Sequence, residues 1–561
     1  MHADHPHPPL PPLQQHTITY RPDDEVDFVV VGSGAAGSVV AKELSSAGFR
    51  VVVLEQGPWR TEKEFGHDEI SVGMENFLTN KWDQSPNTFR ADAKQKAKVQ
   101  PALMYGRLVG GTSVHFSANF WRFREIDFKE ASAKGTVPGT GLVDWPITYQ
   151  ELEPYYTKVD WEVGVAGAPG PFDPPRSRGY PMPPHPPKST GTLLEIGAKK
   201  MGWKAFPAPM AIASQPYDGR SGCVQCGFCI GFGCEVRAKS SALVTMIPKA
   251  VATGKCEVRP NSYVRKVQTD AKGRATGVVY FDGNKKEILQ RAKAVVVCAN
   301  GAETPRLLLN SKSNLFPQGL ANSSGVVGTH LMFNGGGFAS GIFDHEVNGY
   351  KGIVATRIVW DLFELDPKLG LSGGGGFDFR STSTPMQYAM GGLPPKSPTW
   401  GKEYKRLLAH HYTRQLDCYG HTTSLPQASN SISLDPDAKD AWGIPAIRMT
   451  YKDHPQDLKL FDYFAARGEE LLKAAGATET WKAPSTSQEF SVHLLGTCRM
   501  GNDPKASVVD KFNRSHDVKN LFIVDGSSLV TSGRGQPTMT IQALAFRAGD
   551  NIARFAKRGE I

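Results

Sequence analysis

The sequence predicts an α/β fold joined to a second domain built on an antiparallel sheet. Short β-branched apolar runs at 26–31 and 51–54 flank a segment with helical character, which is typical of buried parallel strands around a crossover helix. A second strand–glycine-turn–helix pattern follows at 294–310. Between 331 and 489 the chain changes to short strand-like runs with few strong helices. At 561 residues, two or more domains are expected.

A glycine-rich turn follows the first strand. Gly32, Gly34 and Gly37 stand at G-x-G-x-x-G spacing directly after Val26–Val31. The first glycine allows a tight turn, the second lets a pyrophosphate approach the backbone, and the third lets the helix at 38–47 pack on the strand. The amides and the positive dipole end of that helix would face the phosphates.

Glu55 ends the second strand, where a carboxylate can accept hydrogen bonds from an adenosine ribose. An acid here favours an unphosphorylated ribose, and therefore FAD or NAD rather than NADP. The alternative is a glycine-rich turn in another kind of α/β protein. Strand, glycines, helix, second strand and acid within about thirty residues favour the dinucleotide site.

The composition excludes several classes of protein. Hydrophobic content is 40% and charged content 21%, which is ordinary for a globular protein, and no apolar run approaches the roughly 18–20 residues of a transmembrane helix. The net charge of +9 is scattered, so we expect no nucleic-acid partner. Residues 1–23 lack a secretory signal and are expected to form a disordered tail, with adventitious metal binding by His2, His5 and His7 as the weaker reading.

The domain boundaries follow these changes in character. We expect a first domain at 24–330, with irregular inserts at about 61–100 and 140–200, and a second domain at 331–489. The segment 490–561 returns to the α/β type and to the first domain.

Four of the eight cysteines, Cys223, Cys226, Cys229 and Cys234, fall within twelve residues. Their C-x2-C-x2-C-x4-C pattern is close to the spacing of iron–sulfur ligands in ferredoxins. Zinc and a pair of disulfides are the alternatives. The other four cysteines are isolated and are expected to be small buried apolar residues.

Taken together, the motifs resemble the glucose–methanol–choline (GMC) oxidoreductase family. The matching elements run in family order along nearly the whole chain: Gly32–Gly37 with Glu55, 106–117, 295–309, 425–436, 493–497 and 525–547. The resemblance implies a Rossmann-like FAD-binding domain of GMC type beside a substrate-binding domain on an antiparallel sheet. It also implies oxidation of an alcohol by hydride transfer to flavin N5.

The resemblance assigns two catalytic residues. His493 stands at the position of the base that takes the hydroxyl proton, a task that suits a neutral imidazole. Gln536 stands where relatives have histidine or asparagine before a proline. Its amide can hydrogen-bond the substrate oxygen, but its longer arm shifts the donor by about one carbon–carbon bond. The expected FAD-binding residues are Gly32, Gly34, Ala35, Gly37, Glu55, Gly110, Gly111, Thr112, His115, Val264, Asp525, Gly526, Pro537 and Thr538.

His115 lies in the glycine-rich loop at a point where sugar-oxidising relatives have a histidine bonded covalently to the flavin. The surrounding residues match that arrangement only in part. A covalent bond and a non-covalent contact with the isoalloxazine ring therefore both remain open.

The cysteine segment resembles the flavoprotein subunits of gluconate 2-dehydrogenase and fructose dehydrogenase. The resemblance implies a [3Fe-4S] cluster held by three or all four of these cysteines. It also implies a small subunit exported by a twin-arginine signal, a cytochrome c subunit, and a periplasmic location by co-export of the folded chain, with the cytoplasm as the alternative.

We therefore expect an FAD-dependent dehydrogenase that oxidises a hydroxyl of a sugar, polyol or sugar acid and passes electrons to a cytochrome or quinone. An oxygen-reducing oxidase of the same fold is one alternative. A lyase that uses flavin without redox chemistry is the other.

Overall fold

The computed structural model describes residues 13, 15, 17–381 and 383–561. The predicted tail up to residue 12, with His2, His5 and His7, lies outside the described residues. The predicted boundary at residue 24 is a few residues late. Tyr20 is buried, and its backbone N–H donates to the Glu257 carboxylate at 2.7 Å, so the chain already packs on the first domain there.

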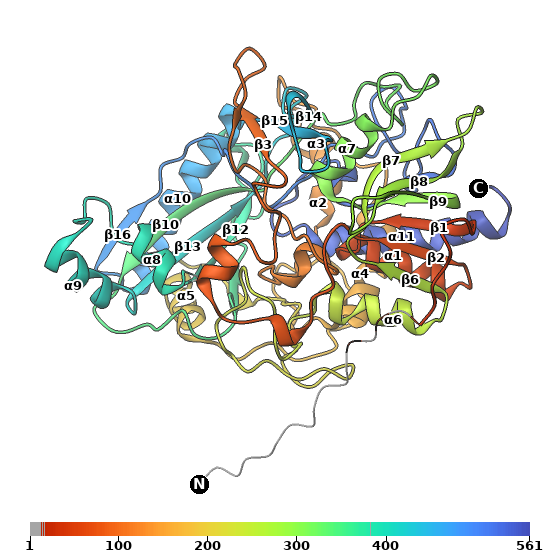
Figure 1. Cartoon of the computed structure of the whole chain (residues 1–561). Coiled ribbons are helices and arrows are strands. Elements are labelled where there is room, and N and C mark those ends of the chain that lie inside the picture. Colours follow the sequence, from red (N-terminus) through yellow and green to blue (C-terminus); the bar gives the residue numbers. More distant parts are fainter. Residues whose placement is uncertain (1–12, 14, 16, 382) are drawn as a thin grey trace, which may run out of the picture.

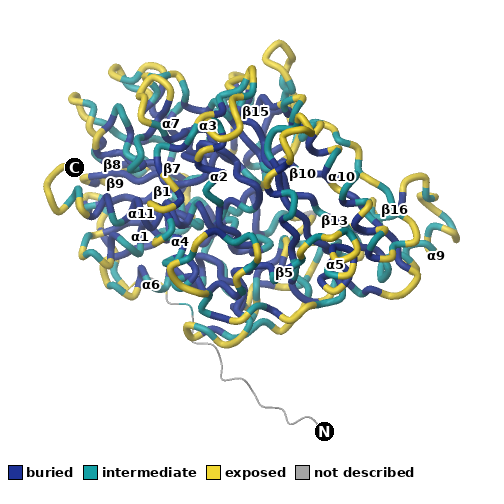
Figure 2. The backbone as a smooth tube through the Cα atoms, turned by 180° about the vertical axis from the view of Figure 1, so that it is seen from behind, coloured by how far each residue is buried: buried dark blue, intermediate teal, exposed yellow. Residues whose placement is uncertain are grey.

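A mostly parallel sheet forms the centre of the first domain (Figure 1). Its parallel strands are β6 (Cys256–Arg259), β2 (Val51–Leu54), β1 (Val26–Val31), β9 (Glu287–Val297) and β17 (Leu521–Ile523). Helices α1 (Ala35–Ser46) and α11 (Thr538–Lys557) pack against each other. Strands β1 and β2 are almost continuously buried because both faces of the sheet are covered (Figure 2).

An antiparallel meander extends this sheet through β8 (Ala275–Phe281) and β7 (Tyr263–Thr269). Residues 256–269 form two strands and not one continuous run. Pro260 and the positive φ of 51° at Asn261 break the run, so that β6 joins the parallel strands and β7 joins the meander.

The second domain contains an antiparallel sheet in the order β16 (Glu479–Lys482), β10 (Gly335–Ile342), β13 (Gln415–Thr422), β12 (Gly375–Arg380), β11 (Arg357–Val359) and β5 (Ala205–Pro207). This confirms the predicted fold class. The last strand, β5, comes from outside the expected range 331–489, so the two domains exchange chain segments.

The expectation of few strong helices in 331–489 is wrong. Helix α10 (Pro455–Ala475) lies across β10, begins with a His454 N-cap and ends at Gly476, whose φ is +109°. Glycines in β10 let the helix approach, since a Cβ on Gly337 would lie 2.3 Å from the Phe461 carbonyl oxygen. Helix α5 (Ser189–Lys200) packs beside α10.

The other elements complete the two domains. A mixed sheet contains β14 (Ser431–Lys439), β15 (Pro445–Thr450), β3 (Asn87–Arg90) and β4 (Lys98–Val99). The helices are α2 (Glu125–Phe128), α3 (Glu130–Lys134), α4 (Tyr149–Val159), α6 (Met246–Ala252), α7 (Asn300–Asn310), α8 (Pro385–Gly391) and α9 (Gly401–His411). Among the described residues, no helix combines the length and the apolar character needed to span a bilayer.

Candidate active site

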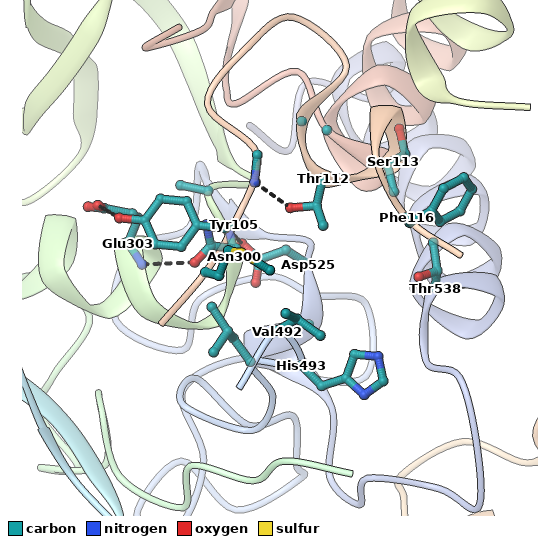
Figure 3. A pocket seen from close by; sticks show the side chains of 18 of the residues that line it. Tyr105, Thr112, Ser113, Phe116, Asn300, Glu303, Val492, His493, Asp525 and Thr538 are labelled. Carbon is teal, nitrogen blue, oxygen red and sulfur yellow. Dashed lines mark hydrogen bonds between the residues drawn. The ribbon is translucent and has the colours of Figure 1, made fainter. Parts of the chain in front are cut away.

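A cavity of about 710 Å³ runs from the carboxyl ends of β1, β2 and β9 to the second sheet (Figure 3). Ligands of open α/β sheets bind outside these strand ends. Most of the sequence-predicted residues line this one cavity: Gly32, Gly34, Ala35, Glu55, Gly111, Thr112, His115, Val264, His493, Asp525, Gly526, Gln536, Pro537 and Thr538. Gly37 and Gly110 are not part of its lining.

The glycines of the first loop have separate structural reasons. Gly32 has a φ of +95°, and a Cβ there would lie 2.5 Å from the Cys298 carbonyl oxygen. A Cβ on Gly37 would lie 2.0 Å from the Gly32 carbonyl oxygen, so this glycine serves helix packing. A Cβ on Gly34 would meet only Gly111, at 3.9 Å. The two glycine-rich loops therefore face each other and leave room for an extended ligand.

Glu55 is held by the backbone of the first loop. Its carboxylate accepts from Ser33 Oγ at 2.7 Å, from Ser33 N at 3.1 Å and from Gly57 N at 3.0 Å. The same Ser33 hydroxyl accepts from the Gly110 N–H at 3.0 Å. Burial raises the pKa of Glu55. Sequence reasoning missed Ser33, which joins the strand-end acid to the second glycine loop.

Asp525 joins the C-terminal segment to α7 at the cavity floor (Figure 3). Its carboxylate accepts from the Thr304 hydroxyl at 2.6 Å, from Ser527 N at 2.8 Å and from Asn300 N at 3.2 Å. Burial raises the pKa of Asp525. This network brings residues more than two hundred positions apart to one wall of the cavity.

The cavity fits a polar cofactor. Three of its lining residues carry buried side-chain atoms without a protein partner: Nε2 of His115, both amide atoms of Asn119, and Oδ1 of Asn334. Buried polar atoms normally have partners, so such atoms around a cavity mark a place where a ligand supplies them. The opposed glycine loops and the acid at the end of β2 suit a dinucleotide at the other end of the cavity.

His493 lies at the end of the cavity nearest the second domain. Burial and the nearby His421 together lower the pKa of His493 to about 4, although a hydrogen bond with Gln536 opposes the shift. The imidazole is therefore neutral near pH 7 and has a lone pair available for a proton. The structure brings His493 and Gln536 together, as expected from the sequence.

A second polar cluster lies beside this pair. His421 on β13 has its Nδ1 3.2 Å from Gln536 Nε2 and its Nε2 2.8 Å from Oδ2 of Asp378 on β12. Arg380 pairs with both oxygens of Asp378, through its Nε at 2.5 Å and through Nη2. Sequence reasoning missed all three residues. The signal was a pair of charged side chains, Asp378 and Arg380, among the apolar residues of the fully buried strand β12.

His115 links the cavity to the cysteine segment. Its carbonyl oxygen accepts from Gly231 N at 2.8 Å. The ammonium of the buried Lys239 donates to the carbonyls of Phe116 at 3.2 Å, Cys229 at 2.6 Å and Phe232 at 2.7 Å. Burial lowers the pKa of His115 to about 4. The cysteine segment is thus tied directly to the loop that borders the cavity.

The four clustered cysteines line one small cavity of about 20 Å³ next to Lys239. Their depth differs, because Cys226 is exposed and Cys229 is buried. Within the described residues, no three His, Cys, Asp or Glu side chains converge as a metal site, and these cysteines are free rather than paired. The metal site predicted at Cys223, Cys226, Cys229 and Cys234 stays a prediction.

The chain belongs to the GMC oxidoreductase family. The N-terminal family model matches residues 26–331 and the C-terminal model matches residues 426–545. The protein is thus an FAD-dependent oxidoreductase that acts on CH–OH groups.

Individual relatives cover nearly the whole chain. The chain is 36% identical to 2-methyl-1,2-propanediol dehydrogenase of Mycolicibacterium austroafricanum, over 95% of this chain and 96% of that protein. It is 30% identical to the gluconate 2-dehydrogenase flavoprotein of Pantoea cypripedii, over 93% of this chain and 92% of that protein. Its fold is similar to that of pyridoxine 4-oxidase from Mesorbium loti, with a TM-score of 0.62, 17% identity, and coverage of 94% of this chain and 99% of that one.

Proposed function

We propose that this protein is a dehydrogenase that oxidises a hydroxyl of a polyol, sugar or sugar acid to a carbonyl, with His493 as the base. The observation that carries the proposal is the neutral imidazole of His493 beside Gln536, at one end of the FAD cavity. His493 takes the hydroxyl proton as the C–H bond breaks. Bound FAD supplies the acceptor for the hydride, which leaves a carbonyl on the substrate.

The cavity wall around His493 supports a hydroxylated substrate. Asn334, Arg380, Tyr419 and Gln488 bring amide, guanidinium and phenol groups to this part of the cavity. Asp378 neutralises Arg380, so the wall presents hydrogen-bonding groups without a large net charge. Relatives that act on a small diol and on gluconate agree with this chemistry.

We propose an electron acceptor other than oxygen, a cytochrome or a quinone. The support is the cysteine segment, which packs on the loop that borders the FAD cavity. Peroxide yield, measured with and without an artificial acceptor, separates this proposal from an oxidase. A lyase without redox chemistry would leave the flavin oxidised when substrate is added.

The cysteine segment is proposed as the site of an iron–sulfur cluster, on its ferredoxin-like spacing and its single shared cavity. Among the described residues, no three of these side chains converge as metal ligands. The proposal therefore covers the binding of a cluster and not its part in electron transfer. Protein purified without oxygen should contain iron and acid-labile sulfide. Their absence, or zinc in their place, would overturn it.

His115 is proposed as the residue through which FAD is attached, because its buried Nε2 has no partner in the protein. Acid precipitation should then leave yellow colour on the protein. Complete release of flavin would show that His115 makes only a non-covalent contact.

We also propose that the chain works with a small subunit carrying a twin-arginine signal and with a cytochrome c subunit, and that it reaches the periplasm folded. The support is the likeness to a gluconate 2-dehydrogenase flavoprotein. Co-purification from cells that express the neighbouring genes, followed by periplasmic fractionation, tests both points.

The experiment that tests the oxidation reaction is an anaerobic screen of the FAD-containing protein. 2-Methyl-1,2-propanediol, D-fructose, D-gluconate and simple polyols are added one at a time, and flavin absorbance near 450 nm is followed. Bleaching by at least one of them, lost in His493→Gln, supports the proposal. Bleaching that persists at the same rate in His493→Gln would overturn the role of His493.

A further inference from the structure

His421 lies in the active site but comes from a different domain than His493 and Gln536. It is carried by β13 of the antiparallel sheet, 115 positions before Gln536. Its ring is buried, with the edge of Trp121 against it at a centroid distance of 5.0 Å. A buried imidazole with both nitrogens in contact with polar groups is fixed in orientation.

The carboxylate of Asp378 sets the tautomer of His421. Asp378 is ionised, since the Arg380 guanidinium and His421 hold its pKa at about 2 despite burial. A carboxylate only accepts hydrogen bonds, so the His421 nitrogen 2.8 Å away, Nε2, carries a proton. Arg380 Nη2 also lies 3.1 Å from this nitrogen, but it donates to Asp378 Oδ2, and the shorter contact with the carboxylate sets the tautomer. Burial lowers the pKa of His421, which leaves the ring neutral and Nδ1 as an acceptor.

The orientation of Gln536 follows from that tautomer. Its Nε2 donates to His421 Nδ1 at 3.2 Å, which directs the amide oxygen away from His421. With Nε2 turned toward His421, the oxygen is the amide atom left for the hydrogen bond between Gln536 and His493, so His493 donates to it. One nitrogen of His493 is then occupied as a donor, and the other keeps its lone pair.

We propose that His421, held by Asp378, is a positioning residue that acts through Gln536 to fix the tautomer of His493. The hydrogen bonds run in one direction, from His493 to Gln536, then to His421, and finally to Asp378. A carboxamide both donates and accepts, so Gln536 can join two histidines. The proposal rests on the proposed role of His493 as the base.

The test is a double-mutant cycle on the FAD-containing enzyme with the best reductant from the screen. His421→Leu removes both polar atoms at similar volume, whereas His421→Gln keeps one donor and one acceptor. His421→Leu should lower the rate constant for flavin reduction at saturating substrate by about 30-fold or more, with KM changed by less than about threefold. His421→Gln should recover most of that loss.

The cycle shows whether His421 acts through Gln536. In a Gln536→Leu background, His421→Leu should lower the rate constant for flavin reduction by less than about threefold, because the hydrogen bonds that join His421 to His493 are already broken. The proposal would be overturned if His421→Leu lowered the rate constant as much in that background as in the wild type, or if it changed only KM. If His493→Gln alone leaves flavin reduction unchanged, the proposed function fails instead, and the two failures are thus distinct.

Two further measurements separate positioning from a folding defect. The surface pair Asp344 and His345, whose Oδ1 and Nδ1 are 2.8 Å apart, is the matched control, and His345→Leu should change neither rate nor stability. In protein labelled with ¹⁵N-histidine, His493 should show one tautomer in the wild type and a mixture in His421→Leu. A single unchanged tautomer in His421→Leu would also overturn the proposal.

Discussion

The guanidinium of Arg534 donates to the Asp127 carboxylate at 2.6 Å, and both side chains are completely buried. Arg534 also pairs with Glu130 at 2.8 Å. Asp127 lies in α2 and Glu130 in α3, about four hundred residues before Arg534. The two ion pairs therefore fasten the turn with Gln536 to these helices. The position of the Gln536 amide thus depends on a buried ion cluster as well as on the backbone of the turn.

Arg534→Met should destabilise the protein by about 3–5 kcal/mol, because it leaves two buried carboxylates without their partner. Urea unfolding measures the change in the free energy of unfolding. Arg406→Met breaks an exposed pair with Glu403 and is the control, for which no measurable change is expected. Equal effects of the two variants would show that the buried cluster is not required.

Gly32→Ala should abolish FAD binding, whereas Gly48→Ala should not. The two glycines have nearly equal φ values, +95° and +96°, but a Cβ meets the Cys298 carbonyl at 2.5 Å only at Gly32. Both variants carry the cost of a left-handed alanine, about 1–2 kcal/mol. Flavin absorbance per protein after purification is the measurement. Equal flavin retention in the two variants would contradict the close-approach argument.

The pH dependence of flavin reduction should reflect a depressed histidine pKa. Burial and the neighbouring His421 hold the pKa of His493 at about 4, so the base is neutral above that value and becomes protonated below it. The rate constant at saturating substrate should be flat above about pH 5 and fall as pH drops through about 4. An inflection near the ordinary value of 6.5 would show a solvent-like histidine instead.

Lys239→Met should destabilise the protein by about 2–4 kcal/mol, since three buried carbonyls lose the ammonium that donates to them. The exposed Lys272→Met is the control and should have little effect. Denaturant unfolding with bound FAD gives both values. A loss no larger than that of the control would mean that the cysteine segment is held to the flavin loop by other contacts.

The local motifs of the first domain were predictable because their causes are local. Gly37 is required by a contact within the strand–turn–helix unit itself, and Gly32 supplies the positive φ of its turn. The Thr148 N-cap of α4 accepts from Glu151 N, as a T-x-x-E pattern predicts. Helix α10 was missed although its signal was present. Its apolar residues recur at helical spacing from Leu460 to Ala475.

The wall of the site around His421 was not predictable from sequence. Asp378 and His421 lie on neighbouring strands more than forty residues apart, and only the pairing of Gly376 with His421 brings them together. Strand register is set by tertiary packing and not by either strand alone. The cysteine spacing predicted a metal-binding segment, but the spacing could not place it in the fold. Its position beside the loop with His115 depends on hydrogen bonds from Lys239 and Gly231.

The most direct test of the central claim is anaerobic flavin reduction by the best substrate, compared between the wild type and His493→Gln at equal FAD content. We predict rapid bleaching in the wild type and a rate constant at least about a hundredfold lower in the variant. Bleaching at the wild-type rate in His493→Gln would contradict the account.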